Sequence, residues 1–318
     1  MSRRGMLLLS LFLWALAPAS AWAQGRDYTR LVVFSDLHLP GRLAELKRKA
    51  ADDVNAWDDA DGVVALGDIV ASQGTPEEYA AAKEFLARLK KPVYPIAGNH
   101  EFRYDTDPRT GKTRRAPPAV RAEKLRLFRE TFSLPSLRYE KRFGPYLLLF
   151  ISIDALESKH LAAISTGTLV WMREVLERDP RAPTIVFFHA PLKGTLGGHG
   201  APPEDKDFFA QPHKGLRRLL RRNPQVFLWV SGHTHVAPSN PRARHPVNLY
   251  EGRITDIHNC DMDGRSSFSD KSAQVTTHAD IWTNSLFLYP DRVVVRTFDH
   301  RRGELLEGSE REIRPRSR

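Results

Sequence analysis

The sequence predicts an α/β layered domain, and two patterns in its apolar residues support this. Short, near-continuous apolar runs recur along the chain, which is typical of strands buried on both faces of a sheet. Longer amphipathic stretches with helix start signals lie between them. Alternation of this kind packs helices against a largely parallel sheet. Because no repeat or low-complexity linker divides the chain, we expect one domain over residues 24–318.

Eight apolar runs are expected to form strands. Two of them lie near the C-terminus, before a charged segment from Arg301 that is expected to fray. The eight runs are Leu31–Phe34, Val63–Leu66, Val93–Ile96, Tyr146–Ile153, Thr184–Phe188, Val226–Val230, Ser285–Tyr289 and Val293–Phe298.

Five amphipathic stretches are expected to form helices, and one of them has clear start signals. Thr75 can cap that helix, Pro76 fits its first position, and Glu78 completes a capping box. The five helices are Arg42–Trp57, Thr75–Leu89, Pro118–Phe132, Thr168–Arg178 and His213–Arg222. Polar segments longer than usual connections, expected to be functional or mobile, are Arg103–Pro118, Lys193–Pro212 and Pro238–Ser269.

The N-terminus has the layout of a secretory signal peptide. Arg3 and Arg4 precede an apolar stretch, and small residues lead to an expected cleavage after Ala23. The apolar stretch is too short to span a bilayer comfortably, and no later segment qualifies. We therefore expect a periplasmic or secreted mature chain without a transmembrane segment, with an uncleaved N-terminal anchor as the alternative. The arginine pair also resembles a twin-arginine export signal, so two export routes stay open.

The composition favours a globular protein that meets anionic ligands. The chain has 318 residues, 41% of them hydrophobic and 27% charged, and a formal net charge of +10. That charge suits phosphates or acidic polymers, although a solvated Arg-rich surface explains it equally well. No nucleic-acid motif accompanies it. Cys260 is the single cysteine, which rules out an intramolecular disulfide, and we expect it to be an uninvolved loop thiol.

Metal-binding side chains follow five of the predicted strands. The strand ends read "FSDLHLP", "ALGDIV", "IAGNHEF", "FFHAP" and "VSGHTHV". In α/β sheets ligands bind at the carboxyl edge of the strands. One such ending could arise by chance, whereas five together indicate a shared site. The side chains concerned are Asp36, His38, Asp68, Asn99, His100, His189, His233 and His235.

The residue types at these strand ends suit a dinuclear metal centre. Carboxylate, amide oxygen and imidazole form a mixed O/N set that fits Mn, Fe, Zn, Ni or Co. Seven such ligands are too many for one ion with open positions, and they match two divalent or trivalent ions that share a carboxylate. Two ions about 3.5–4 Å apart can acidify a bridging water and clamp the oxygens of a phosphoryl displacement.

These motifs resemble the calcineurin-like metallophosphoesterase superfamily. The shared pattern is D-x-H, G-D, G-N-H-[DE], a lone His and G-H-x-H, in this order, over roughly residues 31–236. The resemblance implies a two-sheet β-sandwich flanked by helices (an αββα domain), with the strands of residues 285–298 completing it. It also implies hydrolysis of an anionic phosphodiester or phosphomonoester by in-line attack of a metal-bridging hydroxide.

The resemblance assigns a role to each matched position. His100 corresponds to the family's catalytic histidine, which assists the leaving group. The implied ligands are Asp36, His38 and His235 for one ion, Asn99, His189 and His233 for the other, and Asp68 as the bridge.

Two departures narrow the subfamily. The segment "GDIVASQG" lacks the Asp and Arg of protein Ser/Thr phosphatases, and Ala71 stands where purple acid phosphatases have a tyrosine. The partner of His100 is therefore open, and a catalytically inactive metal-binding scaffold on the same fold is the alternative function. Seven further histidines are expected to be surface or structural residues, with His199 the best candidate for a substrate contact: His160, His199, His213, His245, His258, His278 and His300.

A basic segment begins directly after the His100 turn and is expected to lie near the mouth of the site. Its cations either attract an anionic substrate or are solvated loop charges. They are Arg103, Arg109, Lys112, Arg114 and Arg115.

Overall fold

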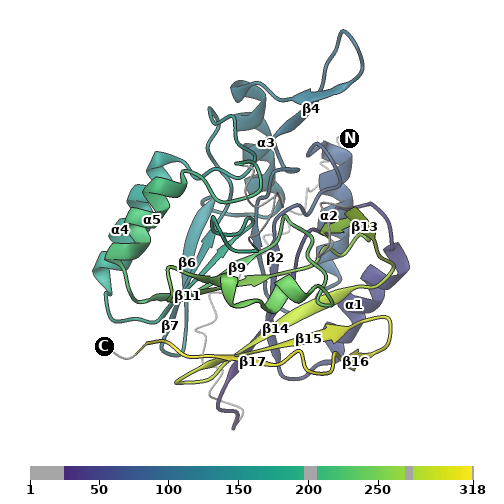
Figure 1. The fold of residues 1–318 in the computed structure, drawn as a ribbon. Helices are drawn as coiled ribbons and strands as arrows, with labels where there is room; N and C mark the ends of the chain where they lie inside the picture. Colours follow the sequence, from purple (N-terminus) through teal and green to yellow (C-terminus); the bar gives the residue numbers. More distant parts are fainter. Residues whose placement is uncertain (1–24, 197–205, 269–274, 317–318) are drawn as a thin grey trace, which may run out of the picture.

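A computed structural model shows two β-sheets packed face to face with helices on their outer faces (Figure 1). The structure describes residues 25–196, 206–268 and 275–316. This αββα arrangement confirms the predicted fold class. The predicted signal peptide and His199 lie outside the described residues.

The first sheet carries the three N-terminal strands at one end. Strands β1 (Thr29–Phe34), β2 (Ala60–Leu66) and β3 (Val93–Ile96) run parallel. The antiparallel strand β14 (Trp282–Leu288) pairs with β1, and β15 (Val293–Asp299) pairs with β14. Two short strands, β16 (Glu304–Leu305) and β17 (Arg311–Ile313), both pair with β15. The chain after Arg301 is therefore paired, and the prediction that it frays is wrong.

The second sheet has a parallel centre with antiparallel edges. Its parallel strands are β7 (Tyr146–Ile151), β8 (Thr184–Phe188), β9 (Val226–Ser231) and β11 (Ile254–His258). The edge strands are β6 (Arg138–Phe143) and β10 (Leu249–Tyr250).

Strands β6 and β11 were not predicted from the sequence. β6 reads RYEKRF and β11 reads ITDIH, so neither is an uninterrupted apolar run. β11 nevertheless lies between β9 and β10, inside a segment expected to be an irregular loop. Pairing with β9 buries it, and this tertiary environment overrides its weak local pattern.

Alternation along the strands divides the core into two layers. Leu31 and Val33 of β1 point between the sheets, where they join Leu148 and Phe187 of the second sheet. Their neighbours Val32 and Phe34 point to the outer face. Since successive side chains of a strand alternate between faces, strands buried on both faces read as continuous apolar runs.

Helices cover both outer faces. The helices α1 (Ala44–Ala56), α2 (Pro76–Ala87) and α3 (Pro118–Thr131) follow the strands of the first sheet, whereas α4 (Thr166–Arg178) and α5 (His213–Arg222) belong to the second. The predicted capping box of α2 is present: Thr75 accepts from the backbone of Glu78, whose side chain accepts from Thr75. Among the described residues, no helix is both long and apolar enough to cross a bilayer.

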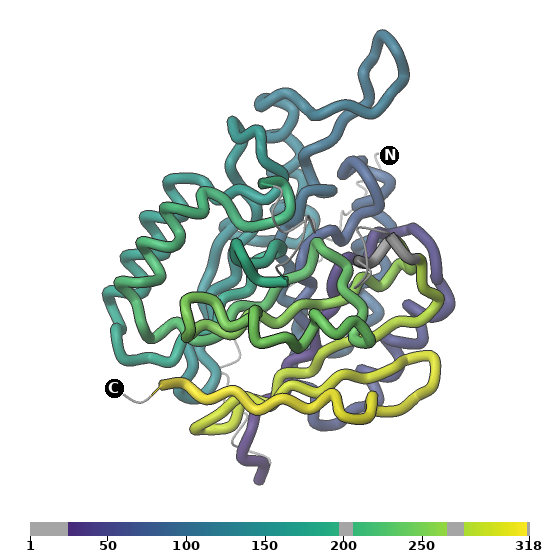
Figure 2. Tube along the Cα trace, viewed as in Figure 1, coloured from purple at the N-terminus to yellow at the C-terminus, as the bar shows by residue number. Residues whose placement is uncertain are grey.

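The long polar segments contain local structure. Residues 103–118 include the hairpin of β4 (Tyr104–Thr106) and β5 (Thr113–Arg115), which projects from the body at the top of Figure 2. A second hairpin joins β12 (Ser266–Phe268) to β13 (Val275–Thr277). Two short 3₁₀ helices, η3 (Pro241–Arg244) and η4 (Pro246–Asn248), precede β10.

Candidate metal centre

The loops after β1, β2, β3, β8 and β9 meet at one edge of the sandwich. They bring all eight predicted site residues there, although the two sheets contribute them separately. Most are buried, whereas the side chains of His100 and His235 keep 21% and 15% of their exposure. The site is therefore largely closed to solvent, and only the His100 and His235 side chains are partly exposed.

Five of these residues adopt a left-handed backbone conformation. Outside glycine this conformation costs on the order of 1–3 kcal/mol per residue and tends to occur at functional sites. Here it turns the chain sharply at the ends of β1, β2 and β9. The φ angles are 51° at Asp36, 47° at His38, 48° at Asp68, 66° at His233 and 50° at His235.

Backbone hydrogen bonds join the loops after β1 and β2. The amide of Asp36 donates to the carbonyl of Gly67 (3.2 Å), and the amide of His38 donates to the carbonyl of Asp68 (2.9 Å). A side chain on Gly67 would approach the His189 ring to 2.6 Å. The glycine of the G-D motif is therefore required by the close packing of a ligand from the other sheet.

Glu101 ties the loop after β2 to the loop after β3. Its carboxylate accepts from the backbone amides of Asp68 (3.0 Å), Ile69 (2.6 Å), Val70 (3.0 Å) and Gly98 (2.6 Å). Burial and the neighbouring Asp68 raise the pKa of Glu101, an effect the amide donors oppose. With its acceptor oxygens occupied by the main chain, Glu101 holds the loops in place and is not a free ligand.

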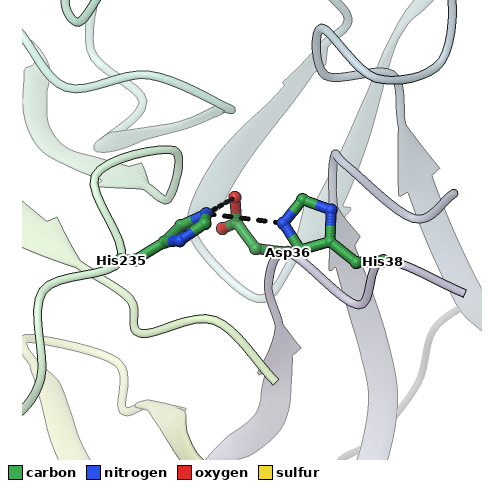
Figure 3. A group of neighbouring side chains, drawn as sticks. All are labelled: Asp36, His38 and His235. Carbon is green, nitrogen blue, oxygen red and sulfur yellow. Dashed lines mark hydrogen bonds and ion pairs between the residues drawn. The ribbon is translucent and has the colours of Figure 1, made fainter. Parts of the chain in front are cut away.

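Asp36, His38 and His235 form one group (Figure 3). The His235 Nε2 atom lies 3.1 Å from Asp36 Oδ1 and 3.4 Å from His38 Nε2. The backbone amide of His233 also donates to both oxygens of Asp36, at 3.2 and 3.1 Å. These contacts join the first sheet to the second directly.

Asp68, His189 and His233 form a second group. The Nδ1 of His189 bonds to the carbonyl of Leu66 (2.8 Å), which leaves Nε2 facing Asp68 Oδ2 at 3.1 Å and Asp36 Oδ1 at 3.7 Å. In His233, Nε2 bonds to the carbonyl of Asp207 (2.9 Å), which leaves Nδ1 for the centre. A carbonyl partner on one ring nitrogen fixes the tautomer that presents the other to a metal.

The buried carboxylates of the centre raise the pKa values of two of its histidines. Burial lowers the pKa of His189, but Asp68 and Asp36 outweigh it and raise it to about 10. Burial also lowers the pKa of His235, but Asp36 and Asp261 outweigh it and raise the pKa to about 9. By contrast, burial and His189 lower the pKa of His233 to about 4. The carboxylates of Asp36 and Asp68 thus favour positive charge beside them, as they would favour a metal cation.

His100 lies beside these groups with one ring nitrogen held by the backbone. Its Nδ1 bonds to the carbonyl of Ser72 (3.1 Å), and its Nε2 lies 3.8 Å from Asp68 Oδ2. The His100 amide also donates to Asp68 Oδ1 (2.8 Å). Burial lowers the pKa of the ring, against the attraction of Asp68. The partner that the sequence left open is therefore the Ser72 carbonyl.

The donors present fit two metal ions. Among the described residues, Asn99 Oδ1 is a buried polar atom without a hydrogen-bond partner, and His189 Nε2 has only the Asp68 and Asp36 carboxylates beside it. Buried polar atoms are seldom left unpaired, and both belong to the predicted ligand set. Because every donor of the set is oxygen or nitrogen, it matches Mn, Fe, Zn, Ni or Co and does not match a thiolate site.

The basic segment after His100 is largely engaged in internal contacts. Arg103 is buried and donates to the carbonyls of Leu161 and Ser158. Arg114 pairs with Asp105 at 3.5 Å, and Arg115 pairs with Asp207 at 2.6 Å. These arginines fix the hairpin and the loop at residue 207, a role that the sequence did not predict.

The segment 259–265 also reaches the centre, which sequence analysis overlooked. The amide of Met262 donates to the carbonyl of Asp36 (3.2 Å). Asp263 accepts a hydrogen bond from buried Lys47 at 2.5 Å, and Arg265 donates to Asp263 (2.9 Å) and to the carbonyl of Ala71 (2.7 Å). The signal available in the sequence was the run "NCDMDGR", which places a cysteine and two aspartates within four positions.

The fold and the edge of converging O/N ligands define a metallophosphoesterase-like class of protein. The family model described as Calcineurin-like phosphoesterase matches residues 29–237. The chain belongs to this family, as its motifs predicted.

Similar proteins include enzymes of several kinds. A glycerophosphodiester phosphodiesterase, GpdQ, of Enterobacter lignolyticus (strain SCF1) is 26% identical over 223 residues, which are 70% of this chain and 72% of the relative. A dimetal phosphatase from Danio rerio has a TM-score of 0.59 at 14% identity, covering 92% of this chain and 100% of its own.

Two further structures share the fold. Purple acid phosphatase PPD1 from yellow lupin (Lupinus luteus) has a TM-score of 0.59 at 16% identity, covering 91% of this chain and 54% of its own. GAP50, described as the anchor in the inner membrane complex of Plasmodium, has a TM-score of 0.55 at 13% identity. The match covers 92% of this chain and 90% of GAP50. The same fold is thus found both in phosphatases and in a protein described as an anchor.

Proposed function

We propose that this protein hydrolyses a phosphodiester or phosphomonoester at a dinuclear metal centre. The observation that carries the proposal is the convergence of seven side chains with oxygen or nitrogen donors, among which Asn99 Oδ1 is buried without a hydrogen-bond partner. Family membership supports it, and the phosphodiesterase relative makes diesters the first substrates to test.

Each sheet would supply part of the ligand set. The first-sheet residues Asp36 and His38, with His235 from the second sheet, would hold one ion. Asn99, with His189 and His233 from the second sheet, would hold the other. Asp68, whose carboxylate lies near both His38 and His189, would bridge the two ions. When bound, the ions would acidify a water and offset negative charge on the phosphoryl oxygens.

His100 would assist the leaving group. The Ser72 carbonyl holds Nδ1, so a proton gained by the ring resides on Nε2, the nitrogen that faces Asp68. The partial exposure of His100 places that proton where an alkoxide could receive it. The negative charge of Asp68 stabilises the protonated form of the His100 ring. A general acid must carry its proton at the working pH.

The test combines turnover with metal analysis of the purified full chain. We expect about two ions per chain, and cleavage of bis-p-nitrophenyl phosphate or p-nitrophenyl phosphate. His100→Ala should lower kcat by roughly 10²–10⁴-fold with the metal content kept. His245→Ala, at an exposed histidine outside the predicted site residues, is the matched control.

The outcomes separate the enzyme from the alternative scaffold. Two bound ions without turnover of either ester would favour a metal-binding scaffold on this fold. Loss of turnover in His245→Ala equal to that in His100→Ala would remove the role given to His100.

We also propose that the chain is exported to the periplasm or secreted. The N-terminal layout of two arginines, an apolar stretch and small residues up to Ala23 supports this. Changing Arg3 and Arg4 to Lys should block export by the twin-arginine route, measured by fractionation. Undiminished export of that variant would favour the ordinary secretory route.

A further inference from the structure

A second cluster of side chains that can bind a metal lies next to the backbone of His235. It consists of Cys260, Asp261 and His278, called here the Cys260 cluster. The His278 Nε2 atom lies 2.6 Å from Asp261 Oδ1 and 3.4 Å from Cys260 Sγ, and Sγ lies 3.8 Å from Asp261 Oδ1. Cys260 and Asp261 are buried, and the His278 side chain is 10% exposed. A sulfur, an oxygen and a nitrogen atom that can each bind a metal thus lie within 4.8 Å of one another.

Other contacts orient each of these donors. Asp261 Oδ2 accepts from the backbone amides of Asp263 (3.0 Å) and Arg265 (2.9 Å), so Oδ1 is the oxygen turned to the cluster. His278 Nδ1 bonds to the carbonyl of Asp280 at 2.8 Å. A histidine whose Nδ1 is held by a carbonyl presents an Nε2 lone pair, which is the usual arrangement around a metal ligand.

We propose that Cys260, Asp261 and His278 bind a third, separate metal ion with a preference for zinc. The mixed S/N/O donors differ from the sulfur-free dinuclear centre, and thiolate ligation selects Zn over Mn or Mg. A thiolate and a carboxylate together balance the charge of one divalent ion. Three protein donors leave one tetrahedral position for water.

The spacing of the donors agrees with one shared ion. With Zn–S about 2.3 Å and Zn–N or Zn–O about 2.0–2.2 Å, tetrahedral donors lie roughly 3.3–3.6 Å apart. The two distances that involve sulfur, 3.4 and 3.8 Å, are close to this range. The 2.6 Å contact of His278 with Asp261 is shorter, as a hydrogen bond requires. Binding of the ion would release this shared proton and the Cys260 thiol proton to solvent, and it would lengthen the contact.

The third ion would stabilise the loop that supports the dinuclear centre. Cys260 Sγ lies 3.8 Å from the carbonyl of His235, and the next residue but one, Met262, donates to the carbonyl of Asp36. The ion would thereby tie residues 259–265 to the hairpin that precedes β14. This role does not depend on the hydrolysis proposed above.

Cobalt substitution tests the proposal, because Cys260 is the only cysteine in the chain. The purified full chain, stripped of metal and loaded with Co²⁺, should show a near-ultraviolet thiolate-to-cobalt charge-transfer band. Cys260→Ser should lose the band and bind one ion fewer per chain. Asp261→Asn, which keeps the thiol, should weaken the band and its Co²⁺ affinity by roughly 10–100-fold or more.

Asp68→Asn is the matched control, since it alters the dinuclear centre alone. It should keep the band while losing other cobalt. If the wild-type chain shows no band, the third site does not exist. The wild-type spectrum decides the point even if Cys260→Ser fails to fold. A band that disappears in Asp68→Asn would assign the thiolate to the dinuclear centre and overturn a separate site.

Discussion

Glu101 and Asp68 are two buried carboxylates at the same edge of the first sheet, yet their surroundings differ. Glu101 accepts four hydrogen bonds from backbone amides, of Asp68, Ile69, Val70 and Gly98. Asp68 accepts one backbone bond, from His100, and otherwise faces imidazoles, with His189 at 3.1 Å.

The difference separates a carboxylate that organises the backbone from one that is available to hold a metal ion. The negative charge of Glu101 is satisfied by amide dipoles that cannot leave. That of Asp68 meets histidines whose protons metal ions can replace. Burial alone therefore does not identify a ligand; the identity of the bonded partners does.

Removing the charge of Asp68 should give the largest effect on activity. Asp68→Asn keeps the shape of the side chain but loses the charge between the two ligand groups, so turnover should fall by about 10³-fold or more. Metal content should fall with it, while the circular dichroism spectrum stays unchanged. Full turnover in this variant would contradict the assignment of Asp68 as the shared ligand.

Removing the charge of Glu101 should instead act on stability. In Glu101→Gln an NH₂ group faces two backbone donors, and each orphaned buried donor costs about 1–3 kcal/mol. We expect the free energy of unfolding to fall by roughly 3–5 kcal/mol in urea titrations.

The control for Glu101→Gln is Glu123→Gln on the solvent-exposed face of α3. Glu123 pairs only with Arg126 at 67% side-chain exposure, so its loss should cost about 0.5 kcal/mol or less. Equal stability changes in the two variants would show that the four amide bonds of Glu101 contribute little.

Asp256 provides a third carboxylate, bonded to protein donors but without a cation beside it. It accepts from the Leu192 amide and from the hydroxyls of Ser231 and Thr195. Burial raises its pKa from 3.8 to about 7. The folded state therefore keeps a proton that the unfolded chain has lost, and stability falls as pH rises through that window.

Asp256→Asn should remove this pH dependence. Relative to the variant, the wild type should lose roughly 2–4 kcal/mol of unfolding free energy between pH 4.5 and pH 8. The Ser231 hydroxyl can turn to accept from the new amide, so the variant should fold. Parallel pH profiles of the two proteins in urea unfolding would show that Asp256 is ionised when folded.

The smallest effect is expected at the surface, where charges are solvated. Arg114 pairs with Asp105 and Asp107 at 3.5 and 3.9 Å, with 39% of its side chain exposed. Such pairs contribute little, so Arg114→Gln should change KM by less than about twofold. A clear rise in KM for an anionic ester would show that the β4–β5 hairpin attracts substrate.

The sequence predicted the fold class and most of the regular elements, and the eight side chains that it singled out lie together at one sheet edge. Strand ends such as "GNH" and "GHTH" mark the sheet edge because the carboxyl ends of parallel strands meet there. The differing roles of Asp68 and Glu101 were less accessible, since both are acidic residues following a strand. Only the four amides that converge on Glu101 distinguish them.

Features built from distant segments were beyond the sequence. Strand β11 has a polar residue inside a short run, and its burial depends on β9 rather than on local preference. Cys260 was expected to be an uninvolved loop thiol, whereas the structure buries it against His278, 18 residues further along the chain. Such contacts follow from tertiary packing, which no local pattern encodes.

The direct bonds from the His233 amide to the Asp36 carboxylate have a consequence for when metal is acquired. Ligands nearly 200 positions apart meet only after both sheets have formed and docked, so an unfolded chain has no high-affinity pocket to offer an ion. The compartment in which the polypeptide completes folding would then determine which ions it encounters first. The metal ions bound at the centre would then depend on the compartment in which the chain folds.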